Sequence, residues 1–243
     1  TLAYGADLSG NNSSMMGGGH YFGIFSKDAL ATAVANINSS LVHDELMNDA
    51  AVQTAYKNAN DMLLDVSPTQ LEIDSITGAL ERATIAVWNN LIEQQYDKEI
   101  LQKEMLRLPV EIQDQIELLS SLNDDAYQFE QAVKALPETI TEEQLLTIPT
   151  IREHYNAMSK NARKFIHQRT KNAFFAAEQQ LQEIIAKLQA ANEAAAKAVE
   201  EEIAALPTNI TLNEQAAVEK AATNYAALTE AQQALVPNKA VLD

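Results

Sequence analysis

The stretch VKALPETITEEQLLTIPTIREHYNAMSKNARKFI (residues 133–166) occurs a second time, without a gap, as IAALPTNITLNEQAAVEKAATNYAALTEAQQALV (residues 203–236). Both copies contain Ala-Leu-Pro, Ile-Thr and Tyr-x-Ala at matching places. The shared positions are apolar residues, helix caps and a proline, and no set of catalytic residues recurs with them. A repeat of this kind predicts tandem copies of one small structural unit.

Each copy begins with the spacing of a capping box, in which a Thr side chain caps a helix and a Gln or Glu three residues later reaches back. The Leu-Pro before each box ends an incoming helix, because proline disfavours helical geometry at the preceding residue. The boxes are Thr141 with Gln144 and Thr211 with Glu214, and the next caps are Ser159 and Thr229. Each copy is therefore predicted to form three helices joined by two turns.

Apolar residues after each box recur at steps of three and four, which places them on one face of a helix. They are Ile148, Ile151, Tyr155 and Met158 in the first copy, and Val218, Ala221, Tyr225 and Leu228 in the second. The first copy departs from this pattern at Pro149, which should kink or restart the helix.

Composition excludes several classes of protein. The chain has 243 residues, a net charge of −17 and no cysteine. Without cysteine it has no disulfide framework, no cysteine-based zinc site and no thiol catalysis. The acidic surface would repel nucleic acid and anionic membranes, and no apolar run approaches the roughly 20 residues that span a bilayer. We expect the chain to be a piece of a longer protein.

Upstream of the repeat, the segment 1–25 is rich in glycine and is expected to form an irregular arm. Ser26 is expected to cap a helix that ends near Ser39, and a second helix should end at Leu64. In Ser67-Pro68-Thr69-Gln70, we expect Ser67 to cap a long third helix, residues 69–108, which Pro109 stops.

Further helices are expected between and beyond the copies, at residues 110–122, 123–134 and 160–206, with Asn123 capping the second of them. The long helices 69–108 and 160–206 would be shared between neighbouring modules. The sequence thus predicts an all-α fold of tandem three-helix bundles joined by long helices into an elongated rod. Its segments are the arm 1–25 and three modules, 26–108, 109–175 and 176–243.

The string Thr69-Gln70-x-x-Ile73-Asp74, preceded by an Ala-rich helix and Leu63-Leu64, resembles the FIVAR module over about residues 27–88. The second copy is similar to helical repeats of Gram-positive surface proteins and extracellular carbohydrate-active enzymes. This resemblance implies an extracellular, bacterial cell-surface setting.

One local anomaly in this acidic chain is basic. Six basic residues lie within twenty positions: Arg152, Lys160, Arg163, Lys164, Arg169 and Lys171. On a continuous helix, Lys160, Lys164, His167 and Lys171 would share a face. The candidate face for an anionic partner, such as a wall polymer or an acidic module, is Lys160, Arg163, Lys164, His167 and Lys171. The alternative is a solvated surface whose lysines pair with nearby carboxylates.

No cofactor motif is recognised, and neither His43 nor His154 has the second histidine that a zinc-protease helix needs. We interpret the chain as a non-catalytic spacer or adhesive segment of a secreted or surface protein, with neighbouring domains, wall polymer, host matrix or glycan as partners. The alternatives are an accessory region of a large carbohydrate-active enzyme and, less favoured, a helical pore-forming toxin.

Overall fold

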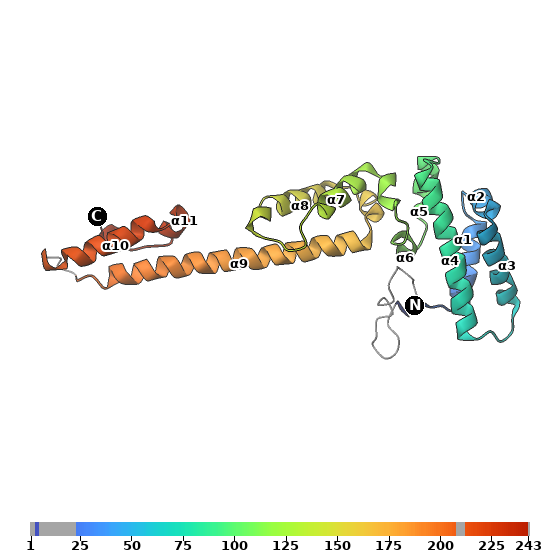
Figure 1. Ribbon diagram of the computed structural model, residues 1–243, viewed down its shortest axis with the longest axis horizontal. Coiled ribbons are helices and arrows are strands. Elements are labelled where there is room, and N and C mark those ends of the chain that lie inside the picture. Colours follow the sequence, from blue (N-terminus) through green and yellow to red (C-terminus); the bar gives the residue numbers. More distant parts are fainter. Residues whose placement is uncertain (1–2, 5–22, 208–211, 243) are drawn as a thin grey trace. The chain divides into compact units, whose positions relative to one another are not determined.

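The computed structural model describes residues 3–4, 23–207 and 212–242, and within them the protein is helical (Figure 1). The α-helices are α1 (Lys27–Asn38), α2 (His43–Asn48), α3 (Ala50–Leu64), α4 (Gln70–Glu93), α5 (Lys98–Met105), α6 (Val110–Gln113), α7 (Asp124–Lys134), α8 (Thr147–Ala157), α9 (Gln168–Ala204), α10 (Gln215–Ala227) and α11 (Glu230–Gln233). Short 3₁₀ helices are η2 (Leu119–Leu122), η3 (Glu142–Gln144), η4 (Ala162–Phe165), η5 (Leu212–Glu214) and η6 (Lys239–Val241). The strands β1 (Ala3–Tyr4) and β2 (Gly23–Ile24) form one short antiparallel pair. The predicted all-α class is confirmed.

The chain divides into two compact units. The first comprises residues 1–136 and 151–173, and the second comprises residues 137–150 and 174–243. The bounds of these units differ from those of the four segments expected from the sequence. The division into an arm and three modules stays a prediction.

In the first unit, α1, α3 and α4 contact one another (Figure 1). The predicted inner faces are confirmed, since Leu30, Val34 and Ile37 of α1 and Val52, Ala55, Ala59 and Met62 of α3 are all buried. The Ser26 cap is also confirmed, because its hydroxyl accepts a hydrogen bond from the Ala29 amide at 3.0 Å. Local capping and the apolar period together define these helices.

The start of α4 differs from the prediction. Thr69, not Ser67, is the cap: its hydroxyl accepts from the Glu72 amide, and the Glu72 carboxylate accepts from the Thr69 amide at 2.8 Å. The hydrogen bond from the Thr69 side chain lowers the pKa of Glu72. Pro68 precedes the cap and so lies outside the helix. The box is Thr-x-x-Glu, which satisfies two otherwise unpaired amides.

The continuous helix expected at 69–108 is wrong, because the chain breaks after Glu93. Gln95 has φ of 56°, and the Tyr96 amide reaches back to the Leu91 carbonyl at 3.0 Å, as in a helix C-terminal turn. Asp97 then caps α5 through the amides of Glu99 and Ile100. An aspartate that accepts these amides stabilises a new helix start at the expense of continuity.

Two further helices are shorter than expected. Residues 110–122 form α6 and η2 rather than one helix, and residues 160–167 form a turn and η4 before α9 begins at Gln168. The Asn123 cap on α7 is confirmed by the bond from the Ala126 amide, at 3.1 Å. The Thr141–Gln144 box is also confirmed, on η3. Pro149 lies in the first turn of α8, where its missing amide is not needed.

The repeat seen in the sequence is confirmed in structure. Helices α8 and α10 end at equivalent residues, Ala157 and Ala227, and η3 and η5 occupy equivalent positions. Five buried positions also match: Ala126/Ala196, Phe129/Val199, Val133/Ile203, Ile151/Ala221 and Ile166/Val236. The end of α9 in the second copy therefore corresponds to α7 in the first, and the repeat extends to residues before Val133. The Thr211 cap lies outside the described residues.

The final turn of the second copy, residues 228–242, also has a counterpart earlier in the chain, at residues 108–122. Here α6 matches α11 and η2 matches η6. The Gln113 side chain donates to the Leu108 carbonyl at 2.8 Å, and Gln233 donates to the Leu228 carbonyl at 3.1 Å. The same side-chain bond thus closes the same turn twice.

Candidate functional site

The predicted basic face is not one helical face, because residues 160–167 precede α9. Lys160 and Lys164 are exposed. Arg163 is committed to its own turn: its side chain donates to the carbonyls of Tyr155 and Asn156, at 3.0 and 2.8 Å, and lies 4.8 Å from the Tyr155 ring centre. The side chain of Arg163 is therefore used in packing, whereas the two lysines face solvent.

His167 is fully buried and pairs with Glu130, which is 1% exposed. A single Glu130 oxygen, Oε1, accepts from the His167 backbone amide and lies 2.7 Å from Nδ1. The other ring nitrogen, Nε2, faces the Ile116 carbonyl at 2.5 Å. Both ring nitrogens thus lie within hydrogen-bonding distance of an oxygen of another residue. His167 is part of the core and does not belong to a docking surface.

Burial shifts the pKa values of Glu130 and Lys171 in opposite directions, because it disfavours the charged form of each. Burial alone would raise the pKa of Glu130, but the hydrogen bonds and charge of His167 outweigh it and hold the pKa at about 2. Burial lowers the pKa of Lys171, which lies near the charges of Asp114 and Glu130. These groups connect α7, the segment between α6 and η2, and the start of α9 within the first unit. Their role is structural.

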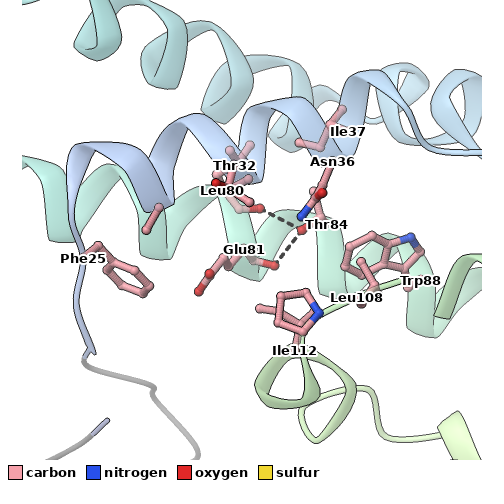
Figure 2. A pocket seen from close by; sticks show the side chains of 13 residues that line it. Phe25, Thr32, Asn36, Ile37, Leu80, Glu81, Thr84, Trp88, Leu108 and Ile112 are labelled. Carbon is pink, nitrogen blue, oxygen red and sulfur yellow. Dashed lines mark hydrogen bonds between the residues drawn. The ribbon is translucent and has the colours of Figure 1, made fainter. Parts of the chain in front are cut away.

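A cavity of about 190 Å³ opens elsewhere in the first unit (Figure 2). It is lined mainly by apolar side chains from the segment before α1, from α1, from α4 and from the region of α6. The lining residues are Phe25, Ala29, Thr32, Ala33, Asn36, Ile37, Leu80, Glu81, Thr84, Trp88, Leu108, Pro109 and Ile112. In Figure 2, Phe25 and Trp88 lie at opposite ends, with Glu81 between them.

The two threonine hydroxyls that line the cavity are already paired within their own helices. The Thr84 hydroxyl faces the carbonyls of Leu80 and Glu81, at 3.1 and 2.9 Å, and the Thr32 hydroxyl donates to the Asp28 carbonyl at 2.8 Å. The Glu81 carboxylate has no hydrogen bond or ion pair to any described residue. It is the charged group that the cavity offers to a ligand.

Burial raises the pKa of Glu81 to about 7. The nearby Arg82 lowers the pKa and Glu111 raises it further, but desolvation is the largest cause. A carboxyl group of this kind, in an apolar cavity, is typical of binding and catalytic sites. Sequence reasoning missed it because Glu81 is one acidic residue among many, and only the fold places Phe25 and Ile112 around it.

Among the described residues, no three His, Asp or Glu side chains come together as a metal site would require. The helices of the described ranges include none with the length and apolar character needed to cross a bilayer. Comparison with protein-family models, with curated proteins and with solved structures finds no match to this chain.

Proposed function

We propose that this chain is a non-catalytic helical spacer of a bacterial cell-surface or secreted protein, built of tandem three-helix modules that form an elongated rod. It holds neighbouring domains apart and offers its sides to wall polymer, matrix or glycan. The surface setting rests on the resemblance of its sequence to FIVAR-type modules and Gram-positive surface repeats.

The observation that carries the proposal is the recurrence of one set of buried positions in both copies of the repeat, with α7 in one copy and the end of α9 in the other. Units that repeat in this way contact mainly their sequence neighbours, which makes an array extend as copies are added. A repeated scaffold with a varying surface suits spacing and display.

The length of α9 supports the same proposal. It has 37 residues, which corresponds to about 55 Å at 1.5 Å per residue. Within this helix there is no glycine or proline. A continuous helix transmits direction, whereas a flexible linker would be rich in glycine and serine.

Small-angle X-ray scattering on the whole chain tests the rod. A compact globule of this length would have a radius of gyration of about 18 Å, and we expect a value well above it. Deleting residues 124–193, one repeat length, should shorten the largest dimension by the length of a module. A radius near that of a globule would contradict the proposal.

Display on cells tests the spacing role. The chain is placed between a wall anchor and a fluorescent reporter on a Gram-positive cell, and antibody access to the reporter is measured. We expect better access than with a compact globular domain of equal length, and reduced access after deletion of residues 124–193. Equal access with the compact domain would overturn the spacing role.

A further inference from the structure

The cavity around Glu81 is not needed by a spacer. The buried positions of the repeat lie in α7 and beyond, whereas the cavity lies between α1, α4 and α6. A spacer would be more stable with these apolar side chains covered, because apolar surface that is left uncovered forfeits burial and packing contacts. The cavity and its unpaired carboxylate therefore call for a separate explanation.

The chemistry of the lining defines the ligand. Two aromatic rings and several aliphatic side chains offer a surface for an apolar body, and a volume of about 190 Å³ suits a small molecule rather than a polymer. The one unpaired charge is negative and lies between the rings (Figure 2). A cationic nitrogen beside Glu81 would gain a charge-assisted hydrogen bond in a partly desolvated site.

The overall charge points to the same ligand class. The chain carries a net charge of −17, and Glu111 adds a further negative charge near the cavity. Arg82 is the nearby cation, yet it makes no ion pair with Glu81. An anionic ligand would be repelled by this environment, and a neutral one would leave the charge of the carboxylate uncompensated.

We infer that the cavity between α1, α4 and α6 binds a small organic cation: an apolar, ring-sized body carrying one protonated amine, with the amine on Glu81 and the body between Phe25 and Trp88. The side-chain amide of Asn36, which also lines the cavity, is a second polar contact for a ligand that has a hydroxyl group.

Three probes of one shape separate charge from fit: 2-phenylethylamine, 2-phenylethanol and 3-phenylpropionate. Trp88 is the chain's single tryptophan, so its fluorescence reports the cavity directly, and calorimetry gives the affinity. At pH 8.5 Glu81 is ionised and the amine is protonated. We expect the amine to bind about tenfold more tightly than the alcohol, the size of one charge-assisted contact, and the carboxylate to bind least.

Three variants of the whole chain test the assignment. In Glu81→Gln the amine should lose its advantage and bind like the alcohol. The matched control is Glu93→Gln, a change at an exposed position of the same helix, which should leave all affinities unchanged. Ala33→Phe fills the cavity and should abolish binding of every probe, while circular dichroism checks that each variant folds.

Several results would overturn the inference. They are binding of none of the three probes, equal binding of amine and alcohol to the natural chain, and amine binding that survives Glu81→Gln unchanged. None of them touches the proposed spacer, because scattering and display do not depend on the cavity.

Discussion

The two copies of the repeated unit share their turns and five buried positions but fill most of those positions with different side chains. In the first copy two of these positions hold Phe129 and Ile151, and in the second they hold Val199 and Ala221. The second core is therefore smaller, although its five buried residues keep the same spacing and pack with Tyr225, Leu228 and Leu242. Caps and turns therefore specify the path of the chain, while the volume of the core sets the stability of each copy.

The copies differ as well in buried charge. The first contains the His167–Glu130 pair, which is closed off from solvent. In the second copy the equivalent positions hold Pro237, which is exposed, and Glu200. One path is thus compatible with a charged core and with an uncharged one, so the ion pair is an addition to the unit and not a requirement of it.

The largest expected difference between the copies comes from truncating one equivalent position. Phe129→Ala should destabilise its copy by about 4 kcal/mol and Val199→Ala by about 2 kcal/mol, because the first removes more buried volume. Phe129→Ala also removes the ring contacts of Phe129 with Tyr155 and His154, whose centroids lie 5.3 and 6.3 Å away.

Native-state hydrogen exchange, followed separately in α8 and α10, gives the opening free energy of each copy. We expect each substitution to affect the helix of its own copy, and α10 to exchange faster than α8 in the natural chain. Equal losses from the two substitutions would contradict the difference in core volume.

The buried ion pair should give the first copy a dependence on acid that the second lacks. The pKa of Glu130 is about 2 when folded and about 4.5 when unfolded. A lowered folded pKa stabilises the protein above pH 4.5, and this stability is lost as the pH falls from 4.5 towards 2. The total is on the order of 3 kcal/mol, from about 1.4 kcal/mol per pKa unit.

The measurement is the difference in unfolding free energy between the natural chain and His167→Ala, taken from pH 6 to pH 2. This difference isolates the pair from the chain's many other carboxylates, and it should shrink as the pH falls. Pro237→Ala, at the equivalent position, is the control and should show a small difference at every pH. A difference that stays constant below pH 4.5 would rule out the ion pair as its source.

Much of the fold follows from the sequence because its signals are local. Ser26, Asn123 and Thr229 cap helices as their spacing predicts, and the repeat correctly predicts that α8 and α10 are equivalent. A cap needs only the residues of its own first turn, so it can be identified without knowledge of the rest of the fold.

The errors arose where two local signals competed. The apolar period up to Leu91, with the next proline at Pro109, favoured a continuous helix, but Asp97 begins a new one. Likewise, the spacing of Lys160 to Lys171 favoured a helical face, but Ser159 caps a short turn and His167 bonds to Glu130, far back along the chain. Long-range pairs of this kind, and the cavity around Glu81, have no local signature.

Loss of the capping hydroxyl, unlike truncation of the core, should cost the same free energy of unfolding in both copies. The Ser159 hydroxyl accepts from the Ala162 amide at 3.0 Å, and the Thr229 hydroxyl accepts from the Gln232 amide at 3.3 Å. Ser159→Ala and Thr229→Ala should each cost about 1 kcal/mol, the usual size for a lost cap. Urea unfolding monitored by circular dichroism measures both, with Ser159→Thr as a control that keeps the cap. A loss confined to one copy would contradict the equivalence of the two turns.

The smallest effect is expected at the residue that closes the turn. Arg163 donates to the Tyr155 carbonyl at 3.0 Å, and at the equivalent position Gln233 donates to the Tyr225 carbonyl at 3.1 Å. Arg163→Gln should therefore keep this bond and lose the exposed bond to the Asn156 carbonyl and the cation–π contact with Tyr155, together about 0.5 to 1 kcal/mol.

Arg163→Ala is the decisive partner variant, because alanine loses the bond as well and should cost about 1 kcal/mol more than glutamine. Thermal unfolding of the three chains, at one pH and salt concentration, gives the ranking. If glutamine were as damaging as alanine, the arginine would act through its charge. The turn of the first copy would then be held by electrostatics, and the second, whose residue is neutral, by a hydrogen bond.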